Sequence, residues 1–253
     1  MIAAARLLAR WYSIPLLLAI WQAAAASGLV VSRLLPSPLE VGAVLLTELG
    51  NGQLVYHAAV TVSRALAGFA LAAVIGIPFA AAMARSSVWR NLFEPIFLLG
   101  YPVPKIALYP VFTYVFGLGA APKIAFTFLE CLYPVVVTCF LGFRAIQTRL
   151  IWTAQNFGAG RALILRRVIL PAALPSVFAA LRIALPVAIV VVVLTEMIGD
   201  SIGLGYYITI WSTRFSFAHV YAAIVTIGIC GFALDQGLLL LRRRVVYWQR
   251  EAA

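Results

Sequence analysis

The chain of 253 residues is too apolar for a soluble protein. Hydrophobic residues make up 64% of it and charged residues 11%, against about 45–50% and about 25% in ordinary globular proteins. The formal net charge is +11, but the cations lie between apolar segments and therefore indicate membrane topology rather than nucleic-acid binding. This composition excludes a soluble fold and predicts an all-α membrane protein.

Six apolar segments are long enough to cross a bilayer, which takes about 20 residues. They lie near residues 11–31, 58–84, 94–116, 122–143, 175–198 and 221–241. The first has features of a signal peptide, because Arg6 and Arg10 precede it and small residues end it. Its length favours a retained span instead. The sequence thus predicts a polytopic bundle of about six transmembrane helices.

A short helix is predicted between the first two spans. Ser37 is suited to cap a helix that has Pro38 at its first position. This helix is expected to run to about Leu49, to end at Asn51 and Gly52, and to lie on the outer face of the membrane.

The positive charges are unevenly distributed among the connections. One set holds Arg6, Arg10, Arg85, Arg90, Arg144, Arg149, Arg161, Arg166, Arg167 and residues 242–244. The other set holds mainly Arg33, Lys123 and Arg214. Because short cytoplasmic connections are enriched in Lys and Arg, this asymmetry predicts six spans with both termini in the cytoplasm.

The connection at about 144–170 is polar enough to leave the membrane, yet it keeps a helical pattern. Leu150, Ile151, Ala154 and Phe157 recur at helical spacing, and Gly158 interrupts the pattern before it resumes at residue 163. Two short helices joined at a glycine would project from the bundle and suit docking on another protein. An ordinary basic loop is equally compatible with the residues alone.

This connection resembles the coupling loop, often called the EAA loop, of bacterial ABC importer permeases. Gly158, Val168, Leu170 and Pro171 match the spacing of the family pattern. Residues 152–154 read Trp-Thr-Ala where the family usually has Glu-Ala-Ala. Without that glutamate, docking on an ATPase subunit is expected to rely on Leu150, Trp152 and Phe157, aided by Arg149 and Arg161.

Further segments, in order along the chain, resemble the nitrate, sulfonate and taurine branch of these permeases. They include Leu-Pro-Ser-Pro at 35–38, Gly-Ile-Pro at 76–78, the proline-rich stretch at 102–110, Phe-Gly-Leu-Gly at 116–119 and Gly-Leu-Gly-Tyr at 203–206. The resemblance implies one permease domain over residues 1–253, with a coupling loop at about 144–170, in the bacterial cytoplasmic (inner) membrane. It implies a translocation pathway for a small, anionic solute.

The same resemblance implies the partners. They are a second permease copy, most simply in a homodimer, two cytoplasmic ATP-binding subunits and an extracytoplasmic solute-binding protein. The chain has no glycine-rich loop ending in Gly-Lys-Ser or Gly-Lys-Thr, so ATP hydrolysis is expected in a partner. We expect no enzyme activity, catalytic residue, cofactor, metal or nucleic acid for this chain itself.

Ionisable residues inside spans are costly and are candidates for function. Lys105 and Glu130 flank a tight turn at 117–121, at depths of roughly 18 and 12 Å below it. They form either a buried ion pair that neutralises both charges or a polar point on the pathway where Lys105 attracts an anion. Glu196 either lines the mouth of the pathway or bonds to residues 203–207. Tyr109 either stacks on a substrate or packs in the core.

Prolines mark the interior spans. Pro102, Pro104 and Pro110 lie in the third span and Pro186 in the fifth. Each removes a backbone donor, and the carbonyl groups that it frees must face protein or water.

Two other functions are compatible with the residues alone. One is an ion-coupled secondary transporter, which the docking loop argues against. The other is a membrane enzyme, for which no catalytic motif is present.

Overall fold

The computed structural model describes residues 12–27, 34–100 and 103–248, and within these ranges the regular structure is helical. Arg6, Arg10, Arg33 and Pro102, which the sequence predictions used, lie outside the described residues. The helices are α2 (Ser13–Ala26), α3 (Pro38–Gly50), α4 (Gln53–Arg85), α5 (Ser87–Gly100), η1 (Lys105–Leu108), α6 (Tyr109–Phe116), α7 (Ala120–Arg144), α8 (Thr148–Asn156), α9 (Arg161–Ile164), η2 (Leu165–Ile169), α10 (Leu170–Gly199), α11 (Leu204–Thr213) and α12 (Phe217–Val245).

Four described stretches are long and apolar enough to cross a membrane. They are α4, α7, the continuous run Arg161–Gly199 that ends in α10, and α12. They coincide with the second, fourth, fifth and sixth predicted spans and extend beyond the predicted bounds at each end. The first predicted span falls on α2, which has 14 described residues.

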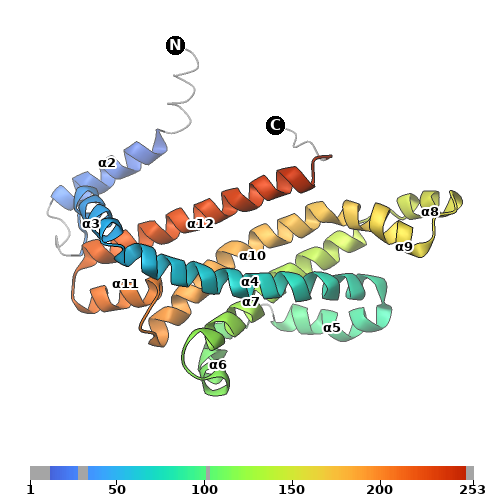
Figure 1. Ribbon diagram of the computed structural model, residues 1–253, viewed down its shortest axis with the longest axis horizontal. Coiled ribbons are helices and arrows are strands. Elements are labelled where there is room, and N and C mark those ends of the chain that lie inside the picture. Colours follow the sequence, from blue (N-terminus) through green and yellow to red (C-terminus); the bar gives the residue numbers. More distant parts are fainter. Residues whose placement is uncertain (1–11, 28–33, 101–102, 249–253) are drawn as a thin grey trace, which may run out of the picture.

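The third predicted span is not one continuous helix. α5 ends at Gly100, and a short 3-10 turn at Lys105–Leu108 leads into α6. The physical reason is proline: Pro104 precedes the turn and Pro110 occupies the first turn of α6, where neither donates a backbone hydrogen bond. Figure 1 shows that α5 runs back along the end of α4, whereas α6 lies apart from it beside the start of α7.

The core forms where α4 packs against α7 and α10. α4 turns a row of small buried residues toward α7, namely Ala65, Gly68, Ala72, Gly76 and Ala80. A Cβ atom at Gly68 would lie 2.7 Å from the side chain of Thr127, and one at Gly76 would lie 2.9 Å from that of Val135. Small residues let helix backbones approach closely, which is how membrane helices gain packing energy.

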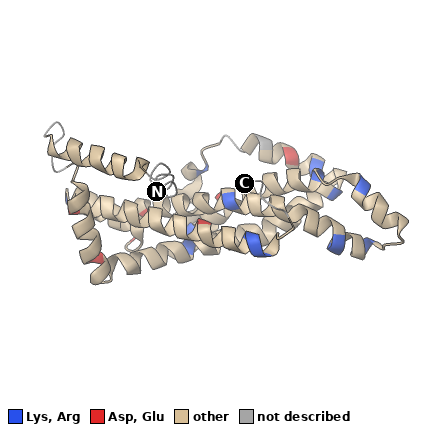
Figure 2. Cartoon of the chain, turned by 90° about the horizontal axis from the view of Figure 1, so that it is seen from above, with Lys and Arg blue, Asp and Glu red and all other residues tan. Residues whose placement is uncertain are grey.

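The two ends of the bundle differ in structure and charge. α3 and α11 lie at one end, and α8 and α9 project at the other (Figure 1). Lys and Arg gather toward the α8–α9 end (Figure 2). α3 confirms the predicted capped helix, because Ser37 Oγ accepts from Glu40 N at 3.2 Å and the Glu40 carboxylate accepts from Ser37 N at 3.0 Å. The buried Val41 also packs α3 onto the bundle.

Candidate functional site

Four charged side chains meet near the α3–α11 end of the bundle. Arg64 of α4 contacts Glu196 of α10 at 2.7 Å and Asp200, just beyond α10, at 2.6 Å. Lys123 of α7 contacts Asp200 at 3.1 Å. All four side chains are at most 7% exposed. Two cations and two anions therefore neutralise one another inside the bundle, and we call these four residues the charge cluster.

Neutral groups complete the hydrogen bonding of the charge cluster. Thr61 donates to Glu196 at 2.8 Å and accepts the N–H of Leu204 at 2.8 Å. The N–H of Gly205 donates to the Glu196 carboxylate at 3.1 Å, and the N–H of Gly203 donates to His57 Nδ1 at 3.0 Å. The cluster thus fastens the start of α11 to α4 and α10.

Gly203, which precedes α11, is the position where the contact between the charge cluster and α11 requires a glycine. Its φ is +113°, a conformation that other residues rarely adopt. A Cβ atom there would also run into the carboxylate of Glu196. The backbone therefore passes directly over a buried charged group, and only a residue without a side chain fits.

The surroundings of Asp200 lower the pKa of its carboxyl group. Burial raises the pKa of this carboxyl, but the N–H of Ser201 and the cations of Lys123 and Arg64 outweigh that effect, so its pKa lies below the usual value. Breaking such a buried pair strands a charge and is strongly destabilising. The arrangement therefore holds α4, α7 and the end of α10 together.

Sequence reasoning found only one of these four charges. Glu196 was singled out, and of its two alternatives the bond to residues 203–207 is confirmed. Sequence reasoning missed Arg64 and Asp200, and it treated Lys123 only as one of the few cations of the outer connections, whereas this side chain is 1% exposed and belongs to the charge cluster. The rule that flagged Glu196, an ionisable residue inside an apolar segment, would also have flagged Arg64.

Lys105 and Glu130 form the predicted ion pair. Lys105 Nζ lies 3.5 Å from the Glu130 carboxylate and 4.4 Å from the centre of the Tyr133 ring. The cation therefore contacts both a carboxylate and the face of an aromatic ring. The side chains are 11% and 17% exposed. An anion would therefore reach Lys105 only by competing with Glu130. A contact of either residue with the transported solute stays a prediction.

Tyr109 is 2% exposed and packs edge-on against Phe126, with 5.7 Å between the ring centres. Core packing is thus its role in this structure. Its place on the pathway, like that of Glu196, stays a prediction.

A second intramembrane ion pair was missed by the sequence analysis. Arg182 of α10 binds Asp235 of α12 through two hydrogen bonds of 2.9 and 3.2 Å. Unlike the charge cluster, this pair is open, because the two side chains are 51% and 28% exposed. Arg182 also lies inside an apolar segment, so the same rule would have found it.

The predicted docking loop has the expected local structure. α8 and α9 flank Gly158, whose φ is +78°. Trp152 and Phe157 are 60% and 86% exposed, and Arg149 and Arg161 are exposed beside them. The other face of α8 turns the half-buried Ile151 toward the bundle. The loop thus presents two exposed aromatic side chains, Trp152 and Phe157, and we call these two residues the docking surface.

Within the described ranges, no group of three or more metal-ligating side chains comes together.

Comparisons with known proteins agree with this arrangement. Residues 60–247 match the family described as binding-protein-dependent transport system inner membrane component. The chain is 34% identical over 244 residues to the taurine transport system permease protein TauC of Escherichia coli (strain K12), covering 94% of this chain and 89% of that protein. It is 29% identical to the putative aliphatic sulfonates transport permease protein SsuC of Bacillus subtilis (strain 168), covering 92% and 84%.

Other relatives widen the range of solutes, and one solved structure supports the fold. The riboflavin transport system permease protein RibX of Chloroflexus aurantiacus is 30% identical, with 92% of this chain and 87% of that protein covered. A chain of the MetNI methionine ABC transporter, solved in inward-facing conformations, matches with a TM-score of 0.56 and 20% identity over 71% of this chain and 93% of that chain. These matches leave the secondary transporter and the membrane enzyme without support.

Proposed function

The chain belongs to the family of binding-protein-dependent transport system inner membrane components, and from this premise we propose that it is the permease subunit of an ATP-driven importer that takes up a small organic anion. A member of this family is a multi-pass protein of the inner membrane.

The observation that carries the proposal is the docking surface. Aromatic side chains are favoured anchors of protein interfaces. Trp152 of α8 and the adjoining Phe157 are both exposed, and α8 projects beyond the long helices (Figure 1). A helix presented this way suits insertion into a groove on a cytoplasmic ATP-binding subunit. Movement in that subunit would then pass through α8 and α9 directly into α10, because α9, η2 and α10 form one continuous run.

Two pairs of variants test the docking. Gly158→Val forces a side chain into a positive φ, whereas Gly160→Val is the matched control, because Gly160 has φ −71° and both sites have open space for a Cβ. Phe157→Ala removes an exposed aromatic ring at the docking surface, and Phe232→Ala removes one from α12.

Gly158→Val and Phe157→Ala are expected to weaken capture of the co-expressed ATPase subunit by roughly 10- to 100-fold and to abolish substrate-stimulated ATP hydrolysis in proteoliposomes. Both control variants are expected to retain capture and stimulation. If all four variants assemble and hydrolyse ATP like the wild type, the docking surface is not the coupling element.

We further propose that the α8–α9 end is cytoplasmic. The gathering of Lys and Arg at this end supports it through the positive-inside rule. After replacement of the three native cysteines, a cysteine at Gly160 is expected to react with a membrane-impermeant thiol reagent only from the cytoplasmic side, and one at Asn51 only from outside. The reverse labelling pattern would contradict the orientation.

The solute class rests on two lines of support. The relatives named for taurine and aliphatic sulfonates transport compounds that share a sulfonate group. Within the bundle, Lys105 is a partly accessible cation between a carboxylate and an aromatic face. We expect taurine or an alkyl sulfonate to stimulate ATP hydrolysis by the complete importer. Stimulation by riboflavin alone would refute the anion assignment.

The open Arg182–Asp235 pair supports a second permease copy. Charged groups halfway along spans are costly against lipid chains and face protein or water instead. Since Arg182 is 51% exposed on this chain, a second copy or the pathway between two copies would cover it in the assembly. We propose a homodimer on this basis, because one chain then supplies both halves of the pathway.

A further inference from the structure

A pocket of about 560 Å³ opens between the bundle and the docking loop. Its lining comes from the end of α4, the end of α7 and the connection after it, α8, α9, η2 and the first residue of α10, and includes Ala82, Arg85, Phe143, Arg161 and Leu165. Ten of its thirteen lining residues are apolar. A volume in this range is typical of pockets that hold small molecules.

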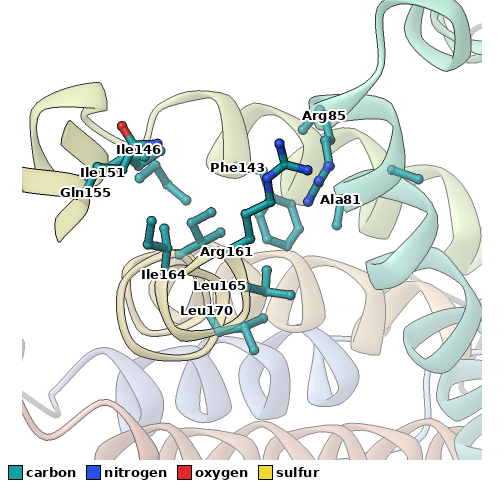
Figure 3. A pocket seen from close by; sticks show the side chains of 13 residues that line it. Ala81, Arg85, Phe143, Ile146, Ile151, Gln155, Arg161, Ile164, Leu165 and Leu170 are labelled. Atoms are coloured by element: carbon teal, nitrogen blue, oxygen red, sulfur yellow. The ribbon is translucent and has the colours of Figure 1, made fainter. Parts of the chain in front are cut away.

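Two arginines mark the edge of this pocket. Figure 3 shows the side chains of Arg85, from α4, and Arg161, from α9, extending toward one another beside Phe143. Among the described residues, no carboxylate forms an ion pair with either guanidinium. Two like charges that share one space repel unless an anion lies between them. The pocket therefore combines an apolar lining with an uncompensated pair of cations.

The position of the pocket in the fold indicates which class of ligand it binds. Arg85 is the last residue of α4 and directly follows the predicted span 58–84. The Arg161 side chain reaches back from the docking loop toward it (Figure 3), so both guanidinium groups lie close to the point where that span meets the polar surface of the membrane. A basic pocket between span ends on the cytoplasmic side is suited to an anionic lipid headgroup. A free inorganic anion would use the two arginines but leave the ten apolar residues unused.

We propose that this pocket binds an anionic phospholipid of the cytoplasmic leaflet, with its phosphate between Arg85 and Arg161 and part of an acyl chain against Phe143 and Leu165. Guanidinium groups bind phosphate through paired, charge-assisted hydrogen bonds. The lipid would join the end of α4 to α9 and thereby hold the docking loop against the bundle. The assignment to the cytoplasmic leaflet rests on the proposed orientation of the permease.

The test is lipid retention by the purified full-length permease without the ATPase subunit, so that its outcome is independent of docking. Native mass spectrometry compares phosphatidylglycerol with phosphatidylcholine of the same acyl chains. The wild type is expected to retain phosphatidylglycerol at least tenfold more than phosphatidylcholine. Arg85→Gln with Arg161→Gln should lose this preference, whereas Arg90→Gln with Arg167→Gln removes the same charge outside the pocket lining and should keep it.

A second variant separates the pocket from general electrostatic attraction. Ala82→Phe keeps both arginines and fills part of the apolar lining, so it should also lose retained lipid. Glycerol phosphate, the soluble headgroup, should not displace the lipid at equal concentration.

Three results would overturn the proposal. The first is equal retention of both lipids by the wild type. The second is full displacement by glycerol phosphate, which would identify a site for free anions. The third is loss of ATPase capture in the Arg85 and Arg161 double variant with lipid retention unchanged, which would identify a carboxylate of the ATPase subunit as the occupant. Because docking is tested separately at Phe157 and Gly158, failure of the lipid site would leave the proposed permease function standing.

Discussion

Replacing Arg64 by methionine would leave two buried carboxylates to share one cation. Arg64 donates to Glu196 at 2.7 Å, to Asp200 at 2.6 Å and to the carbonyl of Ile202 at 3.2 Å. Methionine fills a similar volume, so the main change is the loss of a positive charge. Lys123 still contacts Asp200, but Glu196 keeps only the hydrogen bonds from Thr61 and Gly205.

The expected cost follows from the burial of the charge cluster. Removing one member of a buried ion pair typically lowers the free energy of unfolding by about 3–5 kcal/mol. For a chain of this size, each kcal/mol shifts the melting temperature by about 2–4 °C. Arg64→Met is therefore expected to melt roughly 6–20 °C below the wild type.

The assay is thermal unfolding of the purified permease in one detergent at low ionic strength. Arg149→Met is the control for loss of an exposed arginine and should stay within about 0.5 kcal/mol of the wild type in its free energy of unfolding. Arg64→Met combined with Glu196→Gln removes one charge of each sign and should recover much of the lost stability. A single variant that melts like the wild type, or a double variant no more stable than the single one, would refute the reasoning.

Two further predictions concern the bundle. Lys105→Met should lower the melting temperature more than Glu130→Gln, because it leaves the buried carboxylate of Glu130 without its cation. The variant that carries both changes should fold, and normal transport by this double variant would exclude Lys105 from the solute site. Gly142→Val should lower the free energy of unfolding by about 1–3 kcal/mol, because a Cβ atom there would overlap the side chain of Ser176. Gly237→Val, which has open space around its Cβ, is the control in the same melting assay. Equal melting temperatures of the two variants would contradict close packing of α7 on α10.

The sequence by itself determined the features that depend on neighbouring residues. Apolar length located α4, α7, α10 and α12, and the capping residue Ser37 located the start of α3. A glycine between two helical patterns located the Gly158 turn. Lys105 and Glu130 were also paired correctly, because a tight turn makes their helices antiparallel neighbours and the distance from the turn sets the depth of each side chain.

Only the tertiary structure decided which charges meet across distant parts of the chain. Arg64 lies 132 residues from Glu196 and 136 from Asp200, and Arg182 lies 53 residues from Asp235. Such contacts depend on how each helix is rotated about its axis and which helix it packs against, and neither is encoded in apolar length. For the charge cluster, the small residues of α4 determine how this helix is rotated, because they must face α7 for the two helices to approach closely. That rotation turns Arg64 inward toward Glu196.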